Sequence, residues 1–318
     1  MDEILKFLER GGFVSGQEIS RALGVSRNAV SKWVRTLRER GYDIESMTNK
    51  GYRLIRQPDF ISEEKITRAL STAYIGRPTV YLDEVDSTNE EIKRRARTSS
   101  GQGLVAVADR QTLGKGRLGR RWESPKGMSI YLSVLLRPEL APSQVQCLTL
   151  ASGLAVCNTI NALGFSSKIK WPNDVIIGNK KLCGILTEMS VEDNAVSFAV
   201  VGIGINVNNS AFPQEIESKA TSLYIESGEV CERSDIIAAL LKQLELVYDE
   251  FIMGGFQTIR EEYASLCATI GREIKAELRG RTIIGQAVDI AEDGSLIIKT
   301  DSGLEHISTG EVAVQGIY

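Results

Sequence analysis

The chain has 318 residues, of which 42% are hydrophobic and 25% charged, and its formal net charge is −3. This length accommodates two or three domains, and the composition is typical of a globular protein rather than a disordered or fibrous one. No apolar run reaches the roughly 18 residues that a transmembrane helix needs, and the acidic start MDEILKFLER differs from a signal peptide. We therefore expect a cytoplasmic protein with no membrane partner.

Cysteine and histidine usage narrows the chemistry further. The chain has five cysteines, none of them in a CxxC pair, and a single histidine, His306. An odd cysteine count disfavours a disulfide framework, and one histidine disfavours both a Cys/His zinc site and a histidine-based triad. We therefore predict no protein metal ligands, and chemistry that depends on lysine, arginine, acidic, amide and backbone groups.

The first sixty residues have the pattern of a helix-turn-helix with a wing. Ser15 stands three residues before Glu18, the capping-box spacing, and Ser26 can cap a longer helix that runs to Arg40. Two short helices, a glycine-containing turn and a longer helix form the helix-turn-helix layout. Extended stretches at 43–47 and 52–55, joined by a turn of Thr, Asn, Lys and Gly, predict the wing.

Charge and exposed chemistry in this segment favour DNA as a partner. Residues 1–56 hold 11 Lys and Arg against 7 Asp and Glu, a balance of +4, whereas the remaining residues hold 27 against 34, a balance of −7. Polar and basic side chains on the third helix and the wing tip can bond base edges and phosphates. The predicted DNA contacts are Ser26, Arg27, Asn28, Ser31, Lys32, Arg35 and Lys50. The alternative is a small helical interaction domain whose charges are only solvated.

The middle of the chain mixes predicted strands and helices after an apparent linker at Gln57-Pro58. Periodicity and capping residues predict helices over 62–70, 146–163 and from 234 onward, and strands over 104–108, 128–136, 182–188 and 196–201. Five further short strands are predicted at 273–278, 282–290, 295–300, 304–308 and 312–314. We interpret the last group as a small SH3-like β-barrel, a fold that does not by itself reveal a function.

A glycine-rich cationic loop, GKGRLGRRW at 114–122, follows the strand at 104–108. Its letters satisfy GxGxxG, but a dinucleotide-binding turn needs a helix directly after it, and here Pro125, Gly127 and a strand follow. Glycine lets the backbone approach a ligand closely, and four Lys or Arg side chains stand within seven residues. The loop therefore suits a phosphate cradle, the alternative being a solvated surface loop.

Four other motifs each have an ordinary structural explanation when taken alone. DSTN at 86–89 can be a helix cap, and KWPND at 170–174 can be a strand-to-turn junction. The lysine of KLCGIL at 181–186 can be a solvated strand end, and the glycines of GIGIN at 202–206 indicate a bulge or a close backbone approach.

Together with the cationic loop, these motifs resemble, in order and spacing, the bifunctional branch of the biotin–protein ligase family, whose members also repress a biotin operon. The resemblance covers the whole chain and implies an α+β fold of three domains. These are a winged helix-turn-helix at 1–60, a mixed α/β catalytic domain of biotin/lipoate-ligase type at 61–268, and an SH3-like domain at 269–318. It implies biotin and ATP as substrates with Mg²⁺, and a biotin carboxyl carrier domain, operator DNA and a ligand-induced homodimer as partners.

The resemblance also implies roles for individual residues. Biotin would be bound by Ser87, Thr88, Asn89, Gln111, Lys115, Gly116, Arg117 and Lys181. The nucleotide would be bound by Arg117, Arg120, Arg121, Lys170 and Asn206. Lys181, Arg117 and Lys115 would be the catalytic residues, beside the reacting carboxylate and phosphate. Lys115 stands where the family most often has arginine, and lysine keeps the charge but lacks the bidentate fork.

Three alternatives remain open at this point. A lipoate–protein ligase would share the catalytic fold, and the arginine–glycine loop argues for biotin instead. A ligand-sensing transcription regulator without ligase activity would not need Lys181 or the complete loop. An enzyme with a vestigial winged helix would keep the ligase activity and lose the repressor activity.

Overall fold

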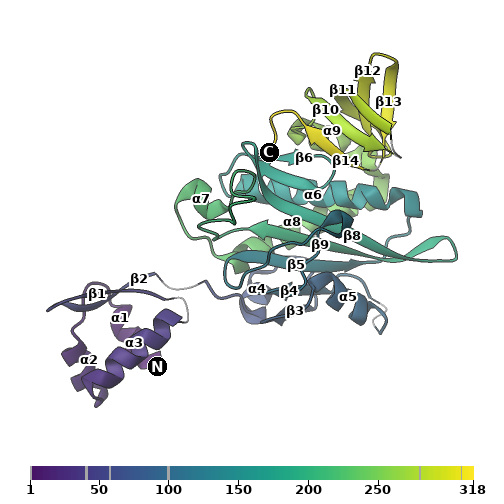
Figure 1. The fold of residues 1–318 in the computed structure, drawn as a ribbon. Coiled ribbons are helices and arrows are strands. Elements are labelled where there is room, and N and C mark those ends of the chain that lie inside the picture. The colour runs from purple at the N-terminus through teal and green to yellow at the C-terminus, as the bar shows by residue number, and fades with distance from the viewer. Residues whose placement is uncertain (1, 40–41, 57–58, 99–100, 279–280, 309) are drawn as a thin grey trace. The chain divides into compact units, whose positions relative to one another are not determined.

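A computed structural model describes residues 2–39, 42–56, 59–98, 101–278, 281–308 and 310–318 (Figure 1). Its contacts divide the chain into two compact units, residues 1–60 and 61–318. The predicted linker at Gln57-Pro58 and the predicted helix end at Arg40 lie outside the described residues. The further boundary at residue 268 stays a prediction.

The first unit is a three-helix domain with a two-stranded hairpin, as the sequence predicts. Its elements are α1 (Asp2–Leu8), α2 (Gly16–Leu23), α3 (Arg27–Glu39), β1 (Asp43–Met47) and β2 (Gly51–Arg56). The hydroxyl of Ser15 accepts the Glu18 amide at 3.0 Å, and that of Ser26 accepts the Ala29 amide at 3.1 Å. Both predicted caps are therefore confirmed.

The hairpin of this unit is fixed to the helical part at one glycine. Gly51 has φ of +103°, and a Cβ there would lie 2.2 Å from the Val14 carbonyl oxygen. Only glycine fits so close an approach with a positive φ. The neighbouring Tyr52 exchanges backbone hydrogen bonds with Val14, at 2.8 and 2.9 Å, so the start of β2 is held against the segment before α2.

The second unit is built on a seven-stranded sheet in the order β3-β4-β5-β9-β8-β7-β6, parallel only between β3 and β4. The strands are β3 (Thr79–Leu82), β4 (Val105–Ala108), β5 (Ser129–Leu136), β6 (Ser167–Lys170), β7 (Asp174–Ile177), β8 (Lys180–Glu192) and β9 (Ala195–Asn206). The helices are α4 (Glu63–Ala69), α5 (Thr88–Ala96), α6 (Val145–Ala162), α7 (Leu223–Ser227), α8 (Arg233–Gly254) and α9 (Phe256–Leu266), with short 3₁₀ turns at Arg117–Gly119 and Pro142–Gln144.

The two faces of the sheet are covered by different helices, because side chains alternate along each strand. On one face, Ala199, Val201 and Ile203 of β9 join a large apolar cluster that includes α6, α8 and α9. On the other face, Val200 packs with Ile92 of α5 in a small separate cluster. The α5 face is therefore only partly filled by hydrophobic side chains, which leaves room beside the helix.

The remaining strands form a small five-stranded antiparallel sheet in the order β13-β12-β11-β10-β14 (Figure 1). Its strands are β10 (Glu273–Leu278), β11 (Arg281–Ile290), β12 (Leu296–Thr300), β13 (Gly303–Ile307) and β14 (Glu311–Val314). Its interior belongs to the same apolar cluster as α6, and the indole N–H of Trp171 donates to the Gly294 carbonyl at 3.1 Å. The predicted strands are thus confirmed, and the small sheet packs against α6 and the turn between β6 and β7.

One helix departs from the expectation that no segment is apolar and long enough to span a membrane. Within the described residues, Pro142–Ala162 meets that requirement by length and composition. However, 72% of its apolar window is buried inside the protein, as expected for the central helix of a large core.

Candidate functional site

The site lies on the α5 face of the sheet, where glycines replace side chains on adjacent strands. Gly184 of β8 is paired in register with Gly204 of β9, and Gly202 follows two residues away on the same face. A Cβ at Gly204 would lie 2.7 Å from the Trp122 ring, and one at Gly202 would lie 2.2 Å from the Asn89 amide oxygen. The predicted close approach to these glycines is confirmed. The groups that lie against the glycine backbone are the side chains of Trp122 and Asn89.

Trp122, the last residue of the cationic loop motif, lies over this glycine pair. Its ring would also be 2.9 Å from a Cβ at Gly184, so both glycines are needed for the indole to rest on the sheet. The indole N–H is buried and has no hydrogen-bond partner among the described residues. Trp122 therefore forms an aromatic floor for the pocket.

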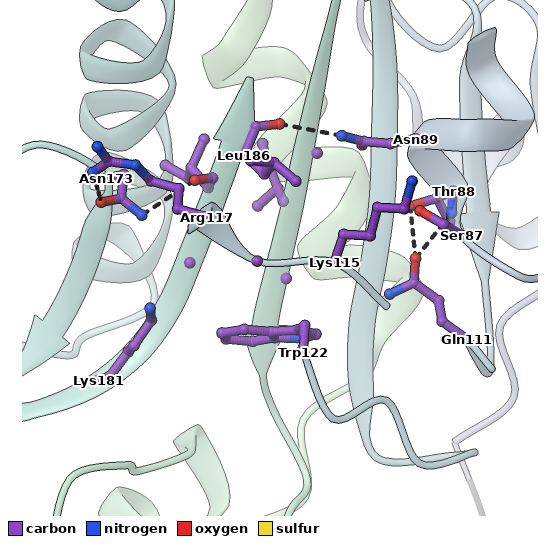
Figure 2. A pocket seen from close by; sticks show the side chains of 16 residues that line it. Ser87, Thr88, Asn89, Gln111, Lys115, Arg117, Trp122, Asn173, Lys181 and Leu186 are labelled. Atoms are coloured by element: carbon purple, nitrogen blue, oxygen red, sulfur yellow. Dashed lines mark hydrogen bonds between the residues drawn. The ribbon is translucent and has the colours of Figure 1, made fainter. Parts of the chain in front are cut away.

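A small pocket at the end of α5 is lined by a continuous polar network (Figure 2). The Gln111 amide oxygen accepts the backbone N–H of Thr88 at 2.9 Å and its hydroxyl at 3.1 Å. The Ser133 hydroxyl lies 2.7 Å from the Thr88 hydroxyl and 2.6 Å from the Asn89 amide oxygen. Since each of these side chains is held by another, the network presents fixed donors and acceptors to a small polar ligand.

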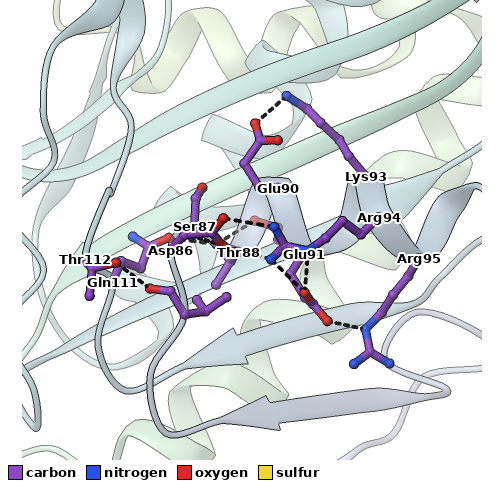
Figure 3. A network of polar contacts seen from close by, with 12 residues as sticks. Asp86, Ser87, Thr88, Glu90, Glu91, Lys93, Arg94, Arg95, Gln111 and Thr112 are labelled. Carbon is purple, nitrogen blue, oxygen red and sulfur yellow. Dashed lines mark hydrogen bonds and ion pairs between the residues drawn. The ribbon is translucent and has the colours of Figure 1, made fainter.

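The first turn of α5 is anchored from outside the pocket (Figure 3). Ser87 occupies the N-cap position, but its side chain makes no capping hydrogen bond although the residue is only 2% exposed. The two terminal guanidinium nitrogens of Arg94 donate to the Asp86 carboxylate, at 2.9 and 2.8 Å, and this lowers the pKa of Asp86 to about 2. The amide of Thr88, the first residue of α5, donates instead to the Gln111 side chain, and the Ser87 hydroxyl is left for another partner.

A second, larger cavity of about 850 Å³ adjoins the first. Its volume is that of a site for a sizeable small molecule. The two share six wall residues, which are Gln111, Gly116, Arg117, Trp122, Asn173 and Lys181. Two ligands bound side by side would meet at this wall.

Two cations stand at the shared wall and are linked through the turn between β6 and β7. Arg117 donates to the Asn173 side-chain oxygen at 2.8 Å and to the Gly310 carbonyl at 3.1 Å. The Lys181 ammonium lies 2.6 Å from an Asp174 carboxylate oxygen and 5.4 Å from the centre of the Trp122 ring. Both charges are thus held where a carboxylate and a phosphate could be brought together.

The structure brings all the predicted ligand-binding residues to one of the two cavities. The smaller is lined by Ser87, Thr88, Asn89, Gln111, Lys115, Gly116, Arg117 and Lys181. The larger is lined by Arg117, Arg120, Arg121, Lys170 and Asn206. Their individual roles stay predictions. Among the wall residues that carried no predicted role are Trp122, Asn173, Asp174 and Tyr318.

Besides Arg117 and Lys181, other predicted residues also have partners within the protein, and Lys115, Arg121 and Asn206 are examples. Lys115 pairs with Glu90 of α5 at 2.6 Å, and this contact is the main cause of the lowered pKa of Glu90. Arg121 lies 3.3 Å from Glu123, and the amide of Asn206 donates to the Thr221 carbonyl at 3.0 Å. A ligand would therefore have to compete for Lys115, whose ion pair is about half exposed and correspondingly weak.

In the first unit, the predicted DNA contacts share an accessible face. The side chains of Ser26, Arg27, Asn28, Ser31, Lys32, Arg35 and Lys50 are all exposed. Ser31 lies 3.1 Å from the Tyr52 hydroxyl of the hairpin, so α3 and the wing are joined on this face. The arrangement is that of a recognition helix beside a wing.

Comparisons with known proteins agree with the three parts of the chain. Residues 81–206 match the Biotin/lipoate A/B protein ligase family, residues 1–53 match an HTH domain, and residues 269–314 match the Biotin protein ligase C terminal domain. The chain is 38% identical to the "Bifunctional ligase/repressor BirA" of Bacillus subtilis, over 98% of this chain and 97% of that protein. The protein of the same name from Escherichia coli is 28% identical over 98% of this chain and 96% of its own length.

A solved structure also resembles the chain. The biotin protein ligase of Aquifex aeolicus, in complex with biotin and ATP, is 34% identical with a TM-score of 0.65, and the match covers 74% of this chain and 98% of that one.

Proposed function

Because the chain belongs to the family of bifunctional biotin–protein ligases and repressors, we propose that its two adjoining cavities join biotin to ATP and that its winged helix represses transcription. The observation that carries the enzymatic part is the wall shared by the two cavities, with Arg117, Trp122 and Lys181 in it. The smaller cavity takes biotin and the larger takes the nucleotide. The first unit takes operator DNA.

The reaction has two steps, and neither needs a covalent bond to the enzyme. The biotin carboxylate attacks the α-phosphorus of ATP, which forms biotinyl-5′-AMP and releases pyrophosphate. The ε-amine of a lysine on a biotin carboxyl carrier domain then attacks the acyl carbon, and AMP leaves. The protein must bring two anions together and stabilise charge at phosphorus, which is a task of positioning and electrostatics. Arg117 and Lys181 supply that charge at the shared wall.

The remaining predicted residues divide between the two ligands. The Ser87 and Thr88 hydroxyls and the Gln111 amide bind the ureido ring of biotin, because they form the fixed polar end of the smaller cavity. Arg120, Arg121 and Lys170 bind the phosphates from the wall of the larger cavity. Mg²⁺ enters with ATP, since it is usually bound largely through the substrate phosphates.

The assignment of biotin is tested against lipoate in one assay. The purified chain is incubated with ATP, Mg²⁺ and either acid, and pyrophosphate release is followed together with labelling of a carrier domain. We expect release with biotin and transfer of biotin to the carrier. Pyrophosphate release with lipoate but not with biotin would identify the chain as a lipoate–protein ligase. Ligand binding without pyrophosphate release would indicate a transcription regulator without ligase activity.

Replacing Gly204 by alanine is expected to raise the KM values for biotin and ATP by about tenfold or more, because the new methyl group would lie 2.7 Å from the Trp122 ring and push it off the sheet. A shift of that ring deforms the wall of both cavities, and about 1.4 kcal/mol of lost binding corresponds to tenfold. Gly101→Ala is the matched control, since a Cβ there meets nothing within 4 Å. Unchanged KM values in Gly204→Ala would contradict the role of the glycine pair.

Repression is proposed to depend on a homodimer that forms when biotinyl-5′-AMP is bound. A single helix-turn-helix reads one half-site, so a specific operator contact normally requires a two-fold dimer. The carrier domain competes for the same protein surface, so abundant unbiotinylated carrier keeps the cytoplasmic protein monomeric and the operon on. Ligand and dimer are then coupled, typically by ~1–3 kcal/mol.

Biotinyl-5′-AMP is therefore expected to shift the protein to a dimer and to tighten operator binding by about 5–150-fold, the range of such couplings. Sedimentation and an operator titration at fixed salt measure both quantities. Lys32→Ala should weaken the operator complex without changing dimer formation, because Lys32 is exposed on the predicted DNA face. Equal dimerisation and equal operator affinity with and without the ligand would exclude biotinyl-5′-AMP as a co-repressor.

A further inference from the structure

Tyr318 lines the larger cavity, beside the wall that the two cavities share, and it comes from the region that follows the small β-sheet. Its backbone N–H donates to the Asn179 carbonyl at 3.1 Å, in the turn between β7 and β8. Its ring lies beneath the Lys170 ammonium at 3.6 Å from the centroid. Its hydroxyl donates to the Asp174 carboxylate. The residue is therefore fixed at its backbone, its ring and its hydroxyl, although it lies far from the site in sequence.

The Asp174 carboxylate that Tyr318 contacts also bonds two residues of the wall that the cavities share. One of its oxygens, Oδ1, accepts the Lys181 ammonium at 2.6 Å and the Asn173 side-chain amide at 3.1 Å. The other, Oδ2, accepts the Tyr318 hydroxyl. Asn173 in turn accepts Arg117 at 2.8 Å. A continuous set of hydrogen bonds thus runs from Tyr318 through Asp174 to both cations at the shared wall.

The direction of the Asp174 carboxylate determines where the Lys181 ammonium lies. A carboxylate bound on one oxygen alone can rotate about its last side-chain bond, because that torsion has a broad energy profile. A donor on the second oxygen removes that freedom, and a hydrogen bond to a charged group is among the stronger ones. The side chain of Asp174 is 12% exposed, so water has little access to take over the Tyr318 contact.

We propose that Tyr318 is a positioning residue for catalysis: its hydroxyl orients the Asp174 carboxylate and, through it, holds Lys181 and Arg117 at the point where biotin and ATP react. This inference rests on the proposed function. It assigns the small β-sheet region a direct part in the ligase reaction, because the residue that orients the site comes from that region of the chain.

The test is Tyr318→Phe, which keeps the ring beneath Lys170 and removes only the hydroxyl. We expect kcat for biotinyl-5′-AMP formation to fall by about tenfold, the effect of one lost hydrogen bond to a charged group, with the KM values for biotin and ATP within about twofold of the parent chain. Tyr74→Phe is the matched control. The Tyr74 hydroxyl also donates to an aspartate, Asp249, at 2.5 Å, and Tyr74 lines neither cavity.

A double-mutant cycle distinguishes positioning through Asp174 from a general structural effect. In an Asp174→Ala background, Tyr318→Phe should change kcat by less than about twofold, because the group it acts on is gone. A full tenfold loss in that background, a parental kcat in Tyr318→Phe alone, or an equal loss in Tyr74→Phe would each overturn the proposal. A parent chain inactive with biotin would overturn the proposed function, and this inference with it, whereas an active parent with an unaffected Tyr318→Phe overturns the inference alone.

Discussion

Replacing Lys181 by alanine is expected to lower kcat for biotinyl-5′-AMP formation by roughly 10²–10³-fold, the usual cost of removing one positioned group that stabilises developing charge. The ammonium lies 2.6 Å from Asp174 and faces Trp122 at 5.4 Å, at the wall where the two cavities meet. No other lysine lines both cavities among the described residues. The loss should therefore appear in kcat as well as in kcat/KM, measured as pyrophosphate release in a single turnover.

Lys180→Ala controls for the removal of a lysine from the same strand, because Lys180 is exposed and lines neither cavity. Operator binding by Lys181→Ala should persist at high protein concentration, since the DNA face belongs to the other unit. Turnover at the parental rate would remove Lys181 from the catalytic residues. A simultaneous loss of operator binding would indicate damage to the fold.

Replacing Arg117 by alanine is expected to weaken both the formation and the retention of biotinyl-5′-AMP by about 10–150-fold, which corresponds to ~1.5–3 kcal/mol for a hydrogen bond to a charged group. Arg117 lines both cavities, and its contacts with Asn173 and Gly310 hold the glycine loop against the opposite side of the site. The variant thus loses the positive charge that would bind the phosphate and the hydrogen bonds that hold the glycine loop in place. Filter binding of radiolabelled biotinyl-5′-AMP, with its dissociation rate, measures the effect.

Two further variants separate these contributions. Arg117→Lys keeps the positive charge but lacks the two parallel N–H donors of arginine. Its retention of biotinyl-5′-AMP should therefore lie between that of the parent and that of Arg117→Ala. Arg281→Ala removes an exposed arginine that pairs with Glu305 at 3.0 Å and lines neither cavity, so it should behave as the parent. If Arg117→Ala holds biotinyl-5′-AMP as long as the parent does, the glycine loop does not bind the phosphate.

The parts of the fold that sequence reasoning predicts well are those with local causes. The caps at Ser15 and Ser26 depend on contacts three residues apart. The strand pattern of the small sheet depends on alternation within each strand and on glycines between strands. The predictions omitted α7 and α9, because the former has only five residues and the latter follows α8 after a single glycine.

The site was only partly predictable, because much of it depends on pairing across the sheet. The residues within the five motifs could be identified from their local chemistry and from the resemblance. Ser133 could not, since it is one serine in a buried strand and reaches Thr88 and Asn89 only through the register of β5. Tyr318 could not either, because its contact with Asp174 joins residues 144 positions apart.

The two units have separate hydrophobic cores, one around Val30 and Val34 of α3 and the other extending from the large sheet into the small one. A ligand stabilises only the cooperative unit that binds it, so biotin and ATP should raise the unfolding temperature of residues 61–318 alone. The winged helix can then have the same fold and the same intrinsic affinity for a half-site whether or not the ligand is present. Control of transcription would lie in how many copies of the chain reach the DNA together, so the response to biotin would steepen with the concentration of the protein itself.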